Sequence, residues 1–407
     1  MAAPQATTYQ CPGDRHPITE SVHLGRLARF YPACRKCPHR DDTGTLSPQQ
    51  IEKLRETRRR ADPPDVWTGE GLCGVYLNQI DAALAYRVGI AMGCLLRERS
   101  ASPPMVCVAS DGRALAPELM EAATSGLRHA GGNVIELGVA SAGAFAATLA
   151  HLSAEGGILI GNPLSQPHTV GLTFWGPRVT PWSAPGTLQA VRDALQHPAS
   201  RPGRAAGGLS RHRIVETYAQ SLREHVHALR PLCVRLETSC RPLIEMLNAL
   251  YRDSACEFLL PGEAPANTGG AHLSLWIDGD GAVCRVRDEQ NRPVPGEHLF
   301  AMLAQHLAEA DPGATFVAEA NCPPRVIQQL RLSGHNAVSG GTTRQQMAEA
   351  MLRHGAVFGG GPSGGFWYAE SYGAPDSLRT LALLLQALSQ SDRTLSQVVA
   401  ASIFDAT

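Results

Sequence analysis

The chain has 407 residues, with 36 Lys and Arg against 37 Asp and Glu and a formal net charge of −1. This balance argues against a nucleic-acid or membrane-surface partner. The length predicts several domains, because a single core rarely grows beyond about 250–300 residues. No apolar run is long enough to span a bilayer and the first ten residues lack a signal-peptide pattern, so we expect a cytoplasmic protein. Eleven cysteines, mostly inside apolar segments, indicate core thiols rather than a disulfide framework.

Residues 1–45 form a Cys/His-rich module. Cys34 and Cys37 make a C-x-x-C pair that places two thiolates in one tight turn, and Cys11 lies one loop away. We expect these three thiolates to hold one zinc ion; an iron–sulfur centre and a polar tail with incidental cysteines are the alternatives. A segment this small has too little core to fold unaided, so a metal would supply much of its stability. The fourth ligand stays open among His16, His23 and His39.

Residues 46–65 are predicted to form a helix and a linker. Ser47 and Pro48 are favoured at the N-cap and first helical positions. The helix ends in three arginines at 58–60, which we expect to be a solvated face, with a phosphate or partner contact as the alternative. Pro63 and Pro64 mark the linker to the rest of the chain.

Residues 66–205 alternate strand and helix patterns, which predicts parallel strands joined by crossover helices. Strands are expected at 105–109, 133–137 and 156–160, and helices at 81–97, after Pro117 and at 142–152. The stretch 156–176, GGILIGNPLSQPHTVGLTFWG, has a buried strand, a turn-rich loop and a second apolar segment. Ligands gather at the carboxyl ends of strands in open α/β sheets, so we expect any chemistry at this loop. A linker is predicted at 202–208.

That stretch resembles the phosphoserine loop of the α-D-phosphohexomutases, the phosphoglucomutase and phosphomannomutase family. The alignment has no gap and keeps the glycine framework, but the family's reactive serine falls on Pro163 and its lysine on Thr173. Ser165 and His168 are the nearby replacements to be considered. The family's arginine near the start of the domain falls on Cys73.

A second resembling segment, VASDGRALAP, keeps Asp111 and Arg113 of the family's GRDSR-type motif. The resemblance implies that the pair faces substrate; a structural ion pair and turn is the alternative.

Residues 206–288 are predicted as a second domain, with helices at 218–229 and 241–251 and strands at 233–236 and 257–260. Its segment IDGDGAV resembles the family's magnesium loop, in which three carboxylates surround a hard cation. Asp278 and Asp280 remain, while the third aspartate falls on Ala282 and the adjacent arginine on Val283. A weak or vestigial magnesium site and a simple Asp-Gly turn are the two interpretations.

Residues 289–407 are predicted as a third domain, with helices at 299–307 and 325–332 and a strand at 315–318. The segment GGGPSGG resembles the family's sugar-recognition loop. It keeps Ser363, but the family's glutamate and histidine fall on Gly361 and Gly365. The aromatic run 366–368 is expected to pack in a sheet, with anchoring of a partner as the alternative.

The resemblance covers about residues 66–405 and implies an α/β fold of three consecutive α/β/α domains behind the module, with the family's fourth domain absent. We expect a protein that has lost phosphosugar mutase activity and serves as a binding or scaffolding protein. The alternatives are an active sugar-phosphate enzyme with altered residues and a metal-dependent interaction module. A phosphosugar ligand, a protein partner and a homo-oligomer stay open.

Overall fold

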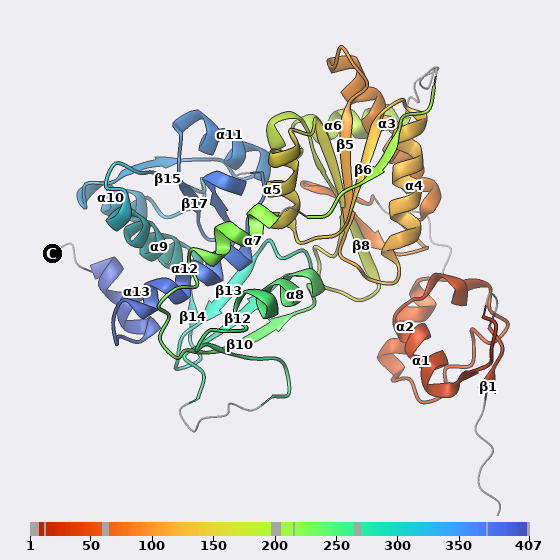
Figure 1. Ribbon diagram of the computed structural model, residues 1–407, viewed down its shortest axis with the longest axis horizontal. Helices are drawn as coiled ribbons and strands as arrows, with labels where there is room; N and C mark the ends of the chain where they lie inside the picture. Colours follow the sequence, from red (N-terminus) through yellow and green to blue (C-terminus); the bar gives the residue numbers. More distant parts are fainter. Residues whose placement is uncertain are drawn as a thin grey trace, which may run out of the picture.

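The computed structural model describes residues 8–11, 14–58, 65–196, 205–214, 216–263, 270–371 and 373–404. Over these residues the protein has a small N-terminal module and a body with three mixed sheets (Figure 1). In the figure the module (red) lies beside the first sheet and far from the C-terminal elements (blue). No helix in the described ranges is long and apolar enough to cross a membrane. The predicted linkers at Pro63–Pro64 and 202–204, and Arg59 and Arg60, lie outside those ranges.

The module is held together by a two-stranded sheet and short helices. The capping box predicted at Ser47 is present: its Oγ accepts from the Gln50 N–H, and the Gln50 side chain accepts from the Ser47 N–H. Leu27, Phe30 and Leu54 pack against the body, so the module shares a core with the first sheet. Its elements are β1 (Thr8–Tyr9), β2 (Ile18–Thr19), α1 (Glu20–Ala28), the 3₁₀ helix η1 (Pro32–Lys36) and α2 (Pro48–Glu56).

The first sheet has the strand order β3-β4-β8-β7-β5-β6-β9. Strands β7, β5, β6 and β9 are parallel, as the alternating pattern predicts. The loop after β7 turns the chain straight back, so β8 is antiparallel to β7, and β4 and β3 continue the antiparallel pairing. The strands are β3 (Trp67–Thr68), β4 (Gly71–Val75), β5 (Met105–Ser110), β6 (Asn133–Val139), β7 (Gly156–Gly161), β8 (Thr169–Trp175) and β9 (Leu209–Arg211).

Helices cover both faces of the first sheet, as Figure 1 shows. Val106 and Val108 face α3 and α4, whereas Cys107 and Ala109 face α5. Helices α3 and α4 approach closely at Gly126, where a Cβ atom would lie 2.1 Å from the Tyr86 carbonyl oxygen. The helices are α3 (Ala82–Arg99), α4 (Ala116–His129), α5 (Ala142–Leu152) and α6 (Thr187–Gln196), with the 3₁₀ turn η2 (Pro177–Val179).

The second sheet has the order β11-β10-β12-β13-β14. One face packs on α7 and α8 through alternating apolar residues such as Val234 and Leu236. The other face carries exposed arginines, including Arg235 and Arg285, so the three-layer expectation is wrong for this part of the body. The predicted helix 218–229 is shorter and earlier. The elements are α7 (Glu216–Arg223), β10 (Cys233–Thr238), α8 (Arg241–Leu250), β11 (Glu257–Leu259), β12 (Leu273–Ile277), β13 (Cys284–Arg287) and β14 (Pro293–Val294).

The third sheet, β16-β15-β17-β18, is covered on both faces. Phe316 packs on the α9 side and Val317 on the α11 side. The aromatic run 366–368 forms the buried strand β18, as expected. The elements are α9 (Gly296–Ala310), β15 (Thr315–Ala318), α10 (Pro324–Leu332), β16 (Asn336–Ser339), α11 (Arg344–His354), β17 (Phe358–Gly360), β18 (Phe366–Tyr368), η3 (Ala369–Ser371), α12 (Ser377–Ser389) and α13 (Leu395–Phe404).

The second and third sheets share one continuous core, which comprises residues between Tyr218 and Val399 together with Ala144 of α5. The Cys284 N–H donates to the Gly364 carbonyl oxygen at 2.9 Å, and Val283 bridges Gly365. The two regions are therefore joined by backbone hydrogen bonds as well as by apolar packing. This joint core brings the loops at the ends of the second and third sheets close together.

Candidate functional site

The loop between β7 and β8 lies at the carboxyl end of a buried strand, as the sequence predicts. Residues 162–168 return the chain, and Ser165 has a positive φ of 57° at the turn. Pro163 packs its ring against Gly171, where a Cβ atom would lie 2.8 Å from the ring carbons. The position of the family's reactive serine is therefore held by a half-buried proline, which has neither a hydroxyl group nor an N–H.

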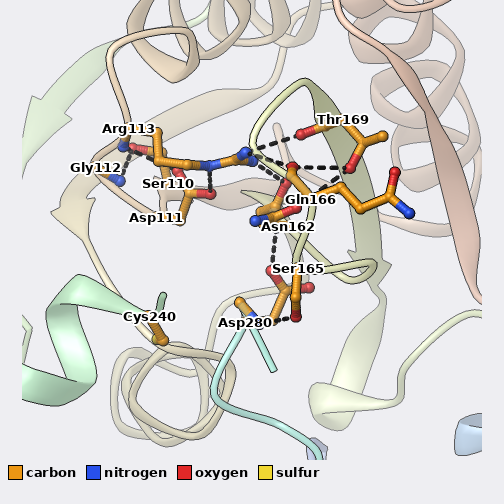
Figure 2. A network of polar contacts seen from close by, with 12 residues as sticks. Ser110, Asp111, Gly112, Arg113, Asn162, Ser165, Gln166, Thr169, Cys240 and Asp280 are labelled. Carbon is orange, nitrogen blue, oxygen red and sulfur yellow. Dashed lines mark hydrogen bonds and ion pairs between the residues drawn. The ribbon is translucent and has the colours of Figure 1, made fainter. Parts of the chain in front are cut away.

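Arg113 holds this loop in place (Figure 2). Its Nε donates to the buried Asp111 carboxylate at 2.5 Å, and its two terminal nitrogens donate to the carbonyl oxygens of Thr169 and Gly161, each at 2.9 Å. Charge-assisted hydrogen bonds of this kind are among the stronger polar contacts in proteins. The pair predicted from the sequence is brought together, and its donors are directed at the protein's own loop.

A second loop, residues 278–282 after β12, lies directly against the first. The Asp280 carboxylate accepts a hydrogen bond from the Asn162 N–H, and the Gly279 N–H donates to Ser165 Oγ at 2.9 Å. A Cβ atom on Gly161 would lie 2.1 Å from Asp280 Oδ1, which measures how closely the loops fit. Figure 2 shows Ser165 and Asp280 side by side at this junction.

The junction contains two buried carboxyl groups. Burial raises the pKa of Asp278 to about 6, partly offset by hydrogen bonds from the N–H groups of Ala282 and Val283. Burial and the neighbouring charge of Asp278 raise the pKa of Asp280 to about 7. Each side chain is about 6% exposed. The carboxyl groups therefore carry protons at a higher pH than exposed aspartates do.

The residues present do not fit the magnesium site that the family loop implies. The third carboxylate position is Ala282, which is buried. The Asp280 carboxylate contacts the backbone of the facing loop, and Asp278 Oδ1 accepts from the Ala282 N–H at 2.7 Å. In the described part of the chain, no three His, Cys, Asp or Glu side chains are grouped as a metal site. Direct protein contacts join the two loops where a hard cation would need oxygen ligands.

His168 and Ser165 contact different parts of the protein. The His168 ring is buried, and its Nε2 lies 3.3 Å from the Glu56 carboxylate of α2, in the module. Burial lowers the pKa of His168, and the charge of Glu56 partly opposes this. Ser165 instead meets the second loop through Gly279. The two replacements that the sequence offers for the lost serine are therefore engaged on separate contacts.

The third loop, residues 361–365, is held by a residue that sequence analysis missed. Glu319, at the end of β15, accepts from the Ser363 N–H at 2.9 Å and from the Ser363 hydroxyl group. It is 5% exposed, and burial raises its pKa. A Cβ atom on Gly361 would lie 2.8 Å from Glu319 Oε2. A carboxylate directly after a buried parallel strand was the available sequence signal.

Two cysteines of the module lie close together, although no group of three metal-binding side chains is found among the residues that the structure describes. The sulfur atoms of Cys11 and Cys37 are 3.8 Å apart, and both side chains are buried. Cys34 packs with the core shared with the first sheet, and burial raises the pKa of its thiol to about 11. The rings of His23 and His39 both lie against Tyr9. His16 is exposed. Zinc binding stays a prediction.

Comparison with known proteins shows which family this chain resembles. The model of "Phosphoglucomutase/phosphomannomutase, alpha/beta/alpha domain I" matches residues 67–183, and that of domain III matches residues 295–404. The phosphomannomutase/phosphoglucomutase of Pseudomonas aeruginosa is 24% identical over 363 residues, covering 83% of this chain and 77% of the relative. The phosphoglucomutase/phosphomannomutase of Thermococcus kodakarensis is 23% identical, covering 81% and 78%.

Solved structures show the same fold. A phosphoglucomutase/phosphomannomutase family protein from Burkholderia thailandensis aligns with a TM-score of 0.71 and 21% identity, over 82% of this chain and 79% of the other. A putative phosphomannomutase from Thermus thermophilus aligns with a TM-score of 0.69 and 18% identity, over 84% of each chain. The chain belongs to the phosphoglucomutase/phosphomannomutase family.

Proposed function

We propose that this chain is a family member that has lost phosphosugar mutase activity and acts as a binding or scaffolding protein. The observation that carries the proposal is the direct contact between the first two loops at Asn162 and Asp280. In the family reaction, a serine phosphate and a cation act together on one phosphoryl group, and the two loops resemble the ones that carry them. Here a protein hydrogen bond occupies that junction, and Pro163 takes the place of the nucleophile.

The chemical requirement supports the proposal. Phosphoryl transfer through an enzyme intermediate needs a nucleophile, charge neutralisation and precise positioning together. Pro163 supplies no nucleophile, and Ala282 removes a cation ligand. Gly361 and Gly365 supply no side-chain partners for sugar hydroxyl groups. Groups that act on one transition state do not compensate one another, so the combined changes oppose the family reaction.

An active phosphotransferase that uses Ser165 is the competing function, and one observation favours it. Ser165 lies beside Asp280, whose raised pKa of about 7 is suited to a general base near neutral pH (Figure 2). Against it, Ser165 Oγ already accepts the Gly279 N–H at 2.9 Å, inside the contact between the loops. Phosphorylation there would have to part the two loops.

A coupled mutase assay and intact mass spectrometry separate the two functions. The purified chain is incubated with glucose 1-phosphate, glucose 1,6-bisphosphate and magnesium, and the Pseudomonas relative serves as the positive control. We expect turnover at the no-enzyme background, no added phosphate mass and no rescue by Pro163→Ser. Turnover above background, or a phosphate adduct that disappears in Ser165→Ala, would establish the competing function instead.

A further inference from the structure

A hollow of about 570 Å³ lies between the N-terminal module and the first sheet. The module contributes Leu27, Phe30 and Leu54 from the ends of its helices, and the body contributes Leu77 and Asn78 from the loop after β4. The volume is within the range of small-molecule sites, which lie preferentially between domains and are mostly apolar. The walls of this hollow are therefore suited to a hydrocarbon or aromatic group.

Two of these apolar residues have strained backbone conformations. Phe30 has a φ of 55° and Leu77 a φ of 67°, and they approach the hollow from the module and from the body respectively. Bulky side chains rarely adopt positive φ, and such residues persist where the surrounding structure imposes them, often at ligand sites. An Asn or Gly would adopt either conformation at lower energy. The strain thus coincides with the presentation of two large apolar side chains to one cavity.

Three arginines, Arg35, Arg40 and Arg58, line the same hollow. Arg58 and Arg40 share one carboxylate, Asp41, at nitrogen–oxygen distances of 2.5 and 3.5 Å. Arg35 pairs with Glu118 at 2.9 Å. Among the described residues, three guanidinium groups at the edge of the hollow thus share the two carboxylates of Asp41 and Glu118.

We propose that this hollow binds a small amphipathic monoanion, an apolar body of roughly fatty-acid or aryl size that carries one carboxylate. The apolar walls take the body, and the arginine group takes the carboxylate through charge-assisted hydrogen bonds. A purely polar metabolite would gain no hydrophobic stabilisation from the leucine and phenylalanine side chains. A neutral amphiphile would make no charge-assisted hydrogen bond to the arginines. The site is separate from the loops of the mutase fold and does not depend on the function proposed for them.

Octanoate, octan-1-ol and acetate test the two halves of the site by isothermal titration calorimetry with the full chain. We expect one octanoate to bind per chain, octan-1-ol to bind at least about tenfold more weakly, and acetate to show no heat of binding. Equal affinity for octanoate and octan-1-ol would overturn the anion site. Equal affinity for octanoate and acetate would overturn the apolar cavity, and absence of octanoate binding would overturn both.

Variants locate the site. Arg58→Gln should weaken octanoate binding at least about fivefold, whereas Arg211→Gln, an exposed ion-pair arginine on β9, should leave it unchanged. Leu77→Asn suits the positive φ, so it should weaken binding while keeping the melting temperature at or above that of the wild type. A lower melting temperature would show that Leu77 serves packing alone. Octanoate binding that is the same in all three variants would overturn the assignment to this hollow.

Discussion

Two junctions in this molecule differ in how the meeting segments fill the space between them. At the first junction, the loop after β7 meets the loop after β12. A backbone N–H group there donates a hydrogen bond to a buried carboxyl group, as from Asn162 to Asp280. Where the module meets the body, large apolar side chains such as Phe30 and Leu77 surround a hollow. The first junction joins the two loops that resemble the family's catalytic loops, and in the function proposed above it is closed by protein contacts. Short polar groups bond directly there, whereas large apolar side chains surround a hollow at the second junction.

The largest expected effect is the loss of a bound zinc ion from the N-terminal module. The Cys11–Cys37 sulfur separation of 3.8 Å matches the edge of a tetrahedron with zinc–sulfur bonds of about 2.3 Å. We therefore expect about one zinc ion per purified chain by elemental analysis, with Cys34 moving to complete the thiolate set. Cys37→Ser should lose the metal and the protease resistance of the module, because structural zinc contributes on the order of 10 kcal/mol to folding.

Cys94→Ser is the matched control, since Cys94 is a buried thiol of α3 in the body. It should retain the zinc. Iron with visible absorbance would point to the iron–sulfur alternative. A chain purified without any stoichiometric metal would show that the module folds on its own core, and the hollow would then depend on packing alone.

The second effect is a loss of stability when Arg113, which holds the loop after β7, is removed. Arg113→Ala removes the donors that hold the loop and leaves the Asp111 carboxylate, 4% exposed, without its partner. Removing one partner of a buried pair typically costs about 3 kcal/mol or more in unfolding free energy. Urea denaturation measures the loss. Arg211→Ala, which breaks an exposed pair with Glu136, should change stability by less than about 1 kcal/mol. Equal losses for the two variants would mean that Arg113 does not hold the loop.

Local sequence patterns predicted the parts of the fold that local physics controls. The cap at Ser47, the strand predicted at 156–160 and the turn-rich loop after it follow from residues within a few positions of one another. The hydrogen bond between Asn162 and Asp280 joins residues 118 positions apart, and no local periodicity encodes it. Glu319 was missed for the same reason, because its role appears only when Ser363 folds against it.

The open face of the second sheet and the shared core could not be predicted from the sequence pattern either. Alternating apolar residues at 234 and 236 show that one face is buried, but they do not show which helices cover it or whether the other face is covered. The resemblance to the family supplied the order of the elements. The hollow forms only where the module packs against Leu77 and Asn78 of the body, and no local pattern encodes that packing.

The smallest expected effect depends on the protons held at the closed junction. The folded-state pKa values of Asp278 and Asp280, about 6 and about 7, lie above the usual value of 3.8. The folded state therefore binds protons that the unfolded chain releases. The stabilisation from these groups is complete at low pH and is lost as the pH rises through 6 and 7. The buried His168, whose pKa is lowered, contributes an opposite slope, so the wild-type curve alone does not isolate the pair.

The variant Asp280→Asn isolates the contribution of Asp280 to stability, because the Asn carbonyl oxygen still accepts the hydrogen bond from the Asn162 N–H but carries no charge. The two proteins should be similarly stable only below about pH 4, where Asp280 is protonated in both the folded and the unfolded chain. From pH 5 to pH 8 the variant should gain about 3 kcal/mol relative to the wild type, because the unfolded wild type is already ionised at pH 5 and the folded wild type ionises only near pH 7, beside Asp278. The exposed Asp193→Asn on α6 should follow the wild type at both values. Repeating the measurement with magnesium sharpens the comparison: a wild type that magnesium stabilises at pH 8, while Asp280→Asn is not, would mean that a cation rather than the facing loop is the partner of this carboxylate.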